Sequence, residues 1–152
     1  MRLQLIVPLA VLLLSTGAAR TAPEVVAYHC VTKGTDEQQD IKVSVELTIP
    51  ADATAGVQLS IGWRGAYADG TELRAPATGS DALKLYAYAG ISGFPGLTSA
   101  TGVGELGTLT PGEPIPLPET TVPLKTTPRN AGKGDVHAAA INFGPRPTDP
   151  VI

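Results

Sequence analysis

The stretch IKVSVELTI, residues 41–49, alternates without a break between apolar and polar side chains. One face carries Ile41, Val43, Val45, Leu47 and Ile49, and the other carries Lys42, Ser44, Glu46 and Thr48. A period of two is typical of an extended chain with one buried face, because successive side chains point to opposite sides. The stretch therefore predicts a half-buried strand. Pro50 ends it, because proline lacks the amide hydrogen that a central strand donates.

Shorter alternating runs occur before and after this stretch. The clearer ones predict strands over 24–31, 57–63 and 83–89, and the weaker ones over 97–103, 105–109, 121–126 and 136–143. The last run contains consecutive alanines that could be helical, but its β-branched flanks and the following Gly144-Pro145 favour a strand. Sequences typical of turns, such as Ala68-Asp69-Gly70, separate the runs.

These runs together predict an all-β fold. Many short strands without a long amphipathic helix indicate an antiparallel β-sandwich with immunoglobulin-like packing, and a closed barrel is the alternative. We expect the sandwich domain to span residues 20–143. The remainder, residues 144–152, reads GPRPTDPVI and predicts a flexible, proline-rich tail.

The first residues have the three parts of a secretory signal peptide. Arg2 supplies the positive start, an apolar run follows over residues 3–14, and small residues follow over 15–19. Gly17 and Ala19 suit the pockets of a signal peptidase, which predicts residues 1–19 as the signal peptide and secretion of the remainder. The apolar run is short for a membrane span of about 20 residues, and no later stretch predicts one.

Composition excludes several function classes. The chain has 152 residues, 43% of them hydrophobic, and a formal net charge of −3. This apolar content is too high for a fully disordered chain. Without a surplus of basic residues, nothing predicts nucleic-acid binding through phosphate contacts.

Cys30 is the one cysteine of the sequence, so it cannot form an internal disulfide. A small buried apolar side chain is the favoured interpretation. The alternative is a free thiol that reacts or pairs between two chains. His29 is adjacent on the same predicted strand and points to the opposite face, so the two side chains cannot form a thiolate–imidazole pair.

Motifs that resemble catalytic or cofactor sites lack the surroundings that their chemistry needs. Residues 102–107 read GVGELG and match a dinucleotide-binding motif, but no helix is predicted after them to hold the phosphates. Residues 117–121 read LPETT and depart from a sortase signal at Thr121, where that signal has glycine. His29 and His137 have no partner at metal-ligand spacing. The sequence therefore predicts no enzyme, no catalytic residue, no cofactor and no metal site.

Tyr86 and Tyr88 are the candidate contact residues. They alternate with Leu85 and Ala87, so both rings stand on the face opposite the apolar one. Exposed rings could stack on a polysaccharide or contact a cell-surface protein. Packing between neighbouring strands is the competing and favoured interpretation. Trp63 lies on the apolar face of its own strand and is expected in the core.

The opening Tyr28-His29-Cys30 and the step from Val45 to Ala51, VELTIPA, resemble small secreted domains of unknown function from high-GC actinobacteria. The resemblance covers the first strand pair and the region of Val122–Leu124. It implies secretion and a β-sandwich and carries no catalytic residues. The expected function is therefore a secreted, non-catalytic domain with a structural or interaction role at the cell surface. A carbohydrate-binding module is the alternative.

Overall fold

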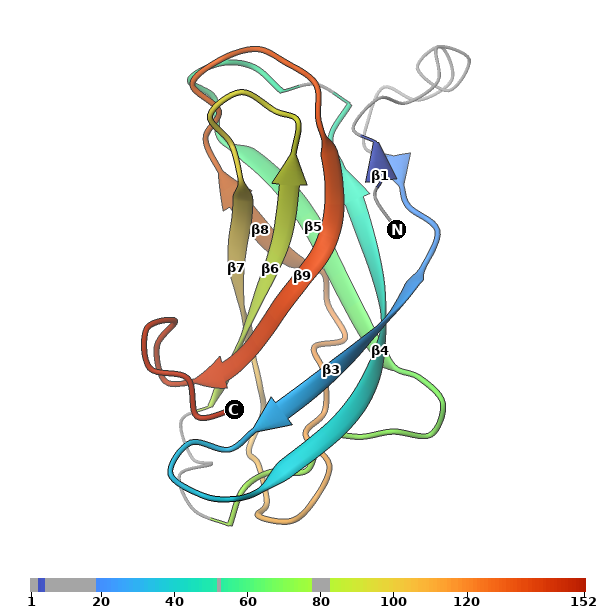
Figure 1. Cartoon of the computed structure of the whole chain (residues 1–152), viewed down its shortest axis with the longest axis vertical. Coiled ribbons are helices and arrows are strands. Elements are labelled where there is room, and N and C mark those ends of the chain that lie inside the picture. Colours follow the sequence, from blue (N-terminus) through green and yellow to red (C-terminus); the bar gives the residue numbers. More distant parts are fainter. Residues whose placement is uncertain (1–2, 5–18, 52, 78–82) are drawn as a thin grey trace.

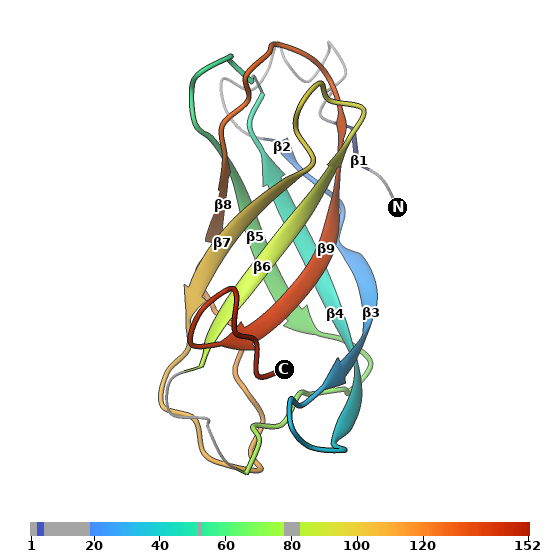
Figure 2. The same cartoon turned by 60° about the vertical axis from the view of Figure 1, so that its left-hand side comes forward.

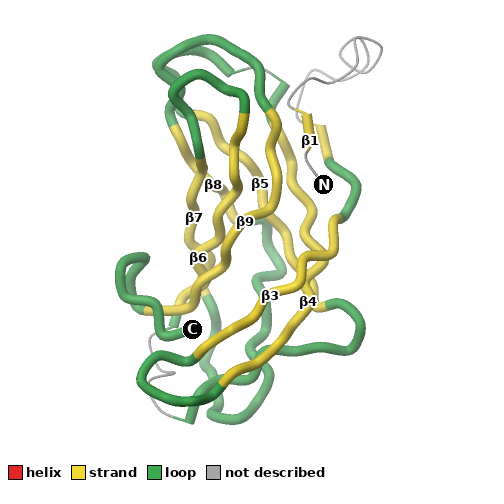
Figure 3. The backbone as a smooth tube through the Cα atoms, in the orientation of Figure 1, coloured by secondary structure: helices red, strands yellow, loops and turns green. Residues whose placement is uncertain are grey.

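The computed structural model describes residues 3–4, 19–51, 53–77 and 83–152, and within these ranges the chain forms strands and loops without a helix (Figure 3). The strands are β1 (Leu3–Gln4), β2 (Ala19–Arg20), β3 (Glu24–Val31), β4 (Gln38–Ile49), β5 (Leu59–Tyr67), β6 (Lys84–Ser92), β7 (Ser99–Glu105), β8 (Val122–Thr126) and β9 (Asp135–Gly144). The predicted all-β class is confirmed. Most of the predicted signal peptide, residues 1–2 and 5–18, lies outside the described residues.

All strand pairs are antiparallel, and the long strands follow the order β9-β6-β7-β8-β5-β4-β3. The short strand β1 extends the sheet beside β9, and the short strand β2 pairs with β4. The sheet curls until its two outer long strands, β3 and β9, lie on the same side of the molecule (Figures 1 and 2). The result is a nearly closed sheet around one apolar interior.

The interior is built from the inward faces of the alternating strands. The predicted apolar face of β4 is fully buried, with Ile41, Val43, Val45, Leu47 and Ile49 each no more than 2% exposed. Trp63 of β5 is 1% exposed, as expected for a core residue. Gly65, next on the same face, leaves room for the Trp63 ring, because an added Cβ at this glycine would collide with it.

Most predicted strands occur within a few residues of their expected bounds. The run over 136–143 is the strand β9, so the helical alternative for its alanines is wrong. The strand predicted over 105–109 is also wrong, because β7 ends at Glu105. Leu109 is nevertheless buried, and Leu106 packs against the core. Both leucines reach the interior from a loop, so apolar spacing alone could not distinguish this segment from a strand.

The residues after Gly144 fold back against the sheet, although their prolines predict flexibility. The amide of Val151 donates to the carbonyl of Phe143 at 2.6 Å, and the amide of Phe143 donates to the carbonyl of Ile152 at 2.8 Å. The amide of Lys33 donates to the carbonyl of Val151 at 2.7 Å. The end of the chain therefore lies between β9 and the turn that follows β3 (Figure 1).

Candidate functional site

The predicted contact residues Tyr86 and Tyr88 lie on the outward face of β6, as their alternation requires. Tyr86 is nevertheless only 7% exposed. Its hydroxyl donates to the carbonyl of Pro145 at 3.2 Å, because the tail folds back past this position. Tyr88 is half-buried beside Thr101 of β7. Tyr86 is therefore covered rather than exposed, so the alternative of two exposed rings does not hold for it, and packing remains the favoured interpretation.

The two remaining tyrosines point inward and act as ties. The hydroxyl of Tyr28 on β3 donates to the carbonyl of Ala139 on β9 at 2.7 Å, and the hydroxyl of Tyr67 donates to the carbonyl of Ile115 at 2.7 Å. Burial raises the pKa of Tyr28 to about 12 and also raises the pKa of Tyr67. Both phenols therefore stay protonated at neutral pH and keep donating these hydrogen bonds.

The junction between β3 and β9, which we call the seam, is where the sheet fails to close. In the described part of the chain, no backbone ladder joins the two strands. Tyr28 spans the seam with its hydroxyl. At one end the carbonyl of Val151 accepts from the amide of Lys33, and at the other β1 pairs with β9 through Leu3 and Val136. The middle of the seam is thus bridged by a side chain rather than by a strand.

Main-chain hydrogen bonds show which backbone groups of β3 point into the seam. The amide of Thr32 donates to the carbonyl of Glu37 at 3.0 Å, which continues the β3–β4 register of Val31 opposite Gln38. Antiparallel partners alternate between pairs that exchange hydrogen bonds and pairs that do not. Even-numbered residues of β3 therefore bond to β4. The odd-numbered residues, Val25, Ala27, His29 and Val31, direct their amides and carbonyls away from β4, and we call them the free edge.

The side chains of the free edge lie on the outer surface. Val25 is 55% exposed and Val31 is 48% exposed, and both are among the large apolar side chains that the structure leaves in solvent. Ala27 and His29 between them are also exposed. The Nδ1 atom of His29 lies 2.6 Å from Oδ1 of Asp40, directly across on β4.

Cys30 points inward from β3 and is half-buried. It packs against the core beside the seam. Burial raises the pKa of its thiol, and the carboxylate of Asp40 adds to the shift. The thiolate, which is the reactive form of cysteine, is therefore disfavoured at neutral pH.

A second candidate site is an open groove of about 820 Å³ on the outer face of β4 and β5, which we call the outer groove. Its floor includes Ser44, Glu46 and Arg64, and its walls include Pro23 and the segment 117–119. Glu46 and Arg64 are direct cross-strand partners. The Nη2 atom of Arg64 donates to the carbonyl of Glu119 at 3.3 Å, which ties the wall to the floor.

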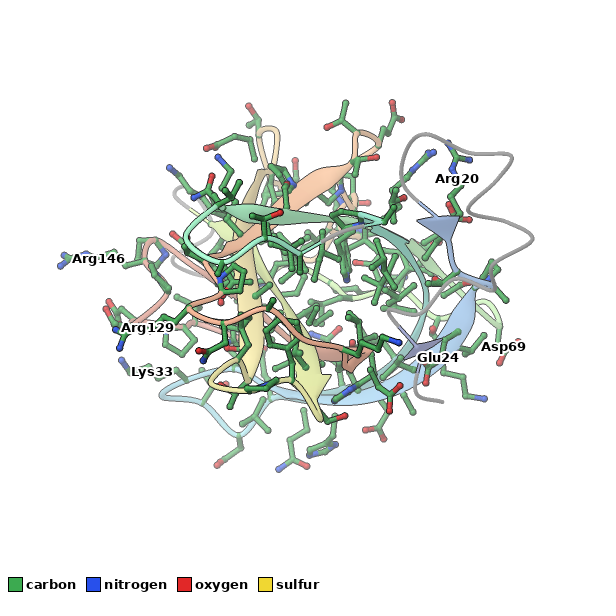
Figure 4. The ribbon with its side chains drawn as sticks, turned by 90° about the horizontal axis from the view of Figure 1, so that it is seen from above. Arg20, Glu24, Lys33, Asp69, Arg129 and Arg146 are labelled. Carbon is green, nitrogen blue, oxygen red and sulfur yellow. The ribbon has the colours of Figure 1, made fainter. Side chains whose placement is uncertain are left out.

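Sequence reasoning missed both the seam and the outer groove. The groove collects residues from four separated segments. In the sequence, only the alternation of polar or small side chains with apolar ones on β4 and β5 indicated a polar outer face there. Figure 4 shows the molecule from above, with charged side chains such as Arg20, Lys33 and Arg146 at its periphery. The seam depends on which strands lie at the ends of the sheet, and the sequence of a single strand does not determine the order in which strands pair.

Among the described residues, His, Cys, Asp and Glu side chains form no group of three that could hold a metal ion. The same residues include no helix long and apolar enough to cross a membrane. No family model matches the chain, and no curated protein or solved structure is detectably similar to it.

Proposed function

We propose that the chain is a secreted, non-catalytic domain with a structural or interaction role at the cell surface. Secretion rests on the sequence of residues 1–19, which has the parts of a signal peptide. The interaction role rests on the outer groove. A pre-formed concavity of this size, with a few polar groups among apolar ones, is a common form of a binding site.

An immunoglobulin-like sandwich is the finer fold assignment within this proposal. The strands β3, β4, β5 and β8 would form one layer, and β7, β6 and β9 the other. Two features support this division. The ladder between β7 and β8 consists of one residue pair, Thr101 opposite Lys125, and the seam separates β3 from β9. The two junctions between the proposed layers are thus the weakest in the sheet.

The chemistry of the outer groove favours an extended polar ligand. Glu46 offers a carboxylate, and Arg64 offers guanidinium donors in a planar fork that matches carboxylates and backbone carbonyls. Pro23 and Pro118 stiffen the walls, so little conformational freedom is lost when a ligand binds. We therefore propose an extended segment of a cell-surface protein as the ligand. The alternative of polysaccharide binding relied on stacking against the rings of both Tyr86 and Tyr88, and the Tyr86 ring is covered.

Retention on cell-envelope fragments of the producing organism tests this proposal. Purified protein should bind the fragments, and Arg64→Glu should reduce binding about tenfold or more, since one lost charge-assisted contact is worth roughly 1.5–3 kcal/mol. Lys125→Glu is the matched control, because Lys125 is an exposed cation of β8 outside the groove. It should bind as the unchanged protein does.

The nature of the ligand follows from treating the fragments before binding. Protease treatment should abolish retention if the groove binds a protein segment. Retention that survives protease and is lost after glycan digestion would move the assignment to polysaccharide. Equal retention of the Arg64→Glu and Lys125→Glu variants would reject the outer groove as the binding site.

A further inference from the structure

The free edge of β3 lacks several of the features by which proteins prevent strand pairing between molecules, although the end of the chain covers the backbone just beyond it at Lys33. Edge strands are commonly protected by lysine, by proline, by a bulge or by shortness. β3 has 8 residues, contains neither lysine nor proline, and pairs with β4 in an unbroken register. Its outward side chains include two exposed valines, Val25 and Val31.

We propose that β3 pairs with β3 of a second copy of this chain, antiparallel and about a two-fold axis at Tyr28. In this arrangement Val25 lies opposite Val31 of the second copy, and Ala27 lies opposite His29 of the second copy. The sheets of the two copies become continuous through their free edges. This inference rests on strand pairing and does not depend on the ligand of the outer groove.

The backbone selects this register. Only odd-numbered residues direct hydrogen-bonding groups outward, so they must pair with odd-numbered residues. A register centred on Ala27 would place Val31 opposite Pro23, which has no amide hydrogen. A register centred on His29 would place Val25 opposite Lys33, whose amide already donates to the carbonyl of Val151. The register centred on Tyr28 uses all four free-edge residues and meets neither obstacle.

The side chains fit the same register. The exposed valines are shielded against each other, and β-branched cross-strand pairs stabilise sheets. Across the new pairing, four outward side chains form one row. Asp40 and His29 come from one copy, and Ala27 and Lys42 follow from the second copy. An acidic group at one end of the row is thus matched by a basic group at the other, and no like charges stand opposite each other. A two-fold axis is also the commonest symmetry of protein dimers.

The proposed register determines which residue of the second copy lies opposite Cys30. This residue lies opposite Val26 of the second copy, in a pair that exchanges no hydrogen bonds, where Cα atoms approach to about 4.5 Å. The two Cys30 residues are offset from each other by four positions along the strand, or about 13 Å, which is beyond the reach of a disulfide. The dimer is therefore non-covalent in the unchanged protein.

Blocking the free edge tests the pairing. Sedimentation of the protein should show a monomer that becomes a dimer as concentration rises. In Ala27→Pro, the dissociation constant should rise at least tenfold, because the lost amide points away from β4 and the added ring obstructs the edge. Ala27→Thr keeps the amide and is the control, and it should dimerise normally. A protein that stays monomeric at all attainable concentrations, or an Ala27→Pro variant that dimerises normally, overturns the proposal.

A cysteine cross-link tests the register itself. In Val26→Cys, the new thiol lies opposite the native Cys30 of the second copy, so mild oxidation should produce a covalent dimer. The new thiol and Cys30 of the same chain are too far apart along the strand to bond to each other. Val25→Cys and the double variant Val26→Cys with Cys30→Ala are the controls, and both should remain largely uncrosslinked. Equal cross-linking in all three variants would reject this register.

Discussion

The two strands of one hairpin, β3 and β4, have the same alternating pattern and very different surroundings. The inward face of β4 is no more than 2% exposed over Ile41–Ile49, because β4 has strands on both sides. The inward residues of β3 are only half-buried, and its outward valines stand in solvent. Alternation therefore decides which face of a strand points inward, while its place in the sheet decides how completely that face is buried.

Truncating an inward leucine or valine on each strand should show the largest difference. Leu47→Ala on β4 should lower the free energy of unfolding by about 2–5 kcal/mol, since it leaves a cavity in a sealed core. Val26→Ala on β3 should lower it by about 1 kcal/mol, because water already reaches this side chain. Urea unfolding of the two variants measures both values. Equal losses would mean that β3 is as well covered as β4.

Replacing Cys30 compares a polar with an apolar substitute at the seam. Cys30→Ser should cost about 1–3 kcal/mol, because the hydroxyl lacks a partner among half-buried apolar groups. Cys30→Ala should cost less. Thermal unfolding under reducing conditions separates the two variants. If Cys30→Ser is as stable as Cys30→Ala, the interior beside β3 is wetter than the structure indicates.

Removing the tie across the seam should have a smaller effect that depends on pH. Tyr28→Phe deletes one hydrogen bond and should cost about 0.5–1.5 kcal/mol near pH 7. The pKa of Tyr28 rises from 10.0 to about 12 on folding, so the neutral phenol stabilises the folded state. This contribution is complete below pH 10.0 and is lost as the pH rises toward 12.

Unfolding curves recorded from pH 8 upward check this dependence, with Tyr67→Phe as the comparison variant, because the Tyr67 hydroxyl donates to the carbonyl of Ile115 rather than across the seam. The unchanged protein should lose stability in the alkaline range more steeply than the Tyr28→Phe variant. Identical slopes for these two proteins would show that the Tyr28 phenol titrates as freely in the folded state as in the unfolded chain.

The outward face of β3 should tolerate substitution best. Val25→Thr removes exposed apolar surface without touching the core, so it should change the stability of the monomer by less than about 0.5 kcal/mol. Its effect should appear instead in self-association, because the pair of Val25 with Val31 of the second copy is weakened. Chemical denaturation of dilute protein, followed by sedimentation at high concentration, separates the two effects.

The sequence predicted those features that depend on neighbours along the chain. The alternation over 41–49 located β4 and its buried face, and the inward position of Trp63 followed from the same reasoning. The covering of Tyr86 could not be predicted, because it depends on the carbonyl of Pro145, which lies 59 positions away in the sequence. The seam and the outer groove are likewise products of long-range pairing, which places β3 at the end of the sheet and brings segment 117–119 beside Arg64.

Residue-resolved hydrogen exchange on β3, measured at low and high protein concentration, tests the role of the free edge most directly. At low concentration the amides of Val26, Tyr28 and Cys30 should be protected by β4, while those of Val25, Ala27, His29 and Val31 should exchange quickly. Raising the concentration should protect this second set selectively. Protection of the second set in dilute protein, or fast exchange of the second set at high concentration, would contradict pairing of the free edge between two copies.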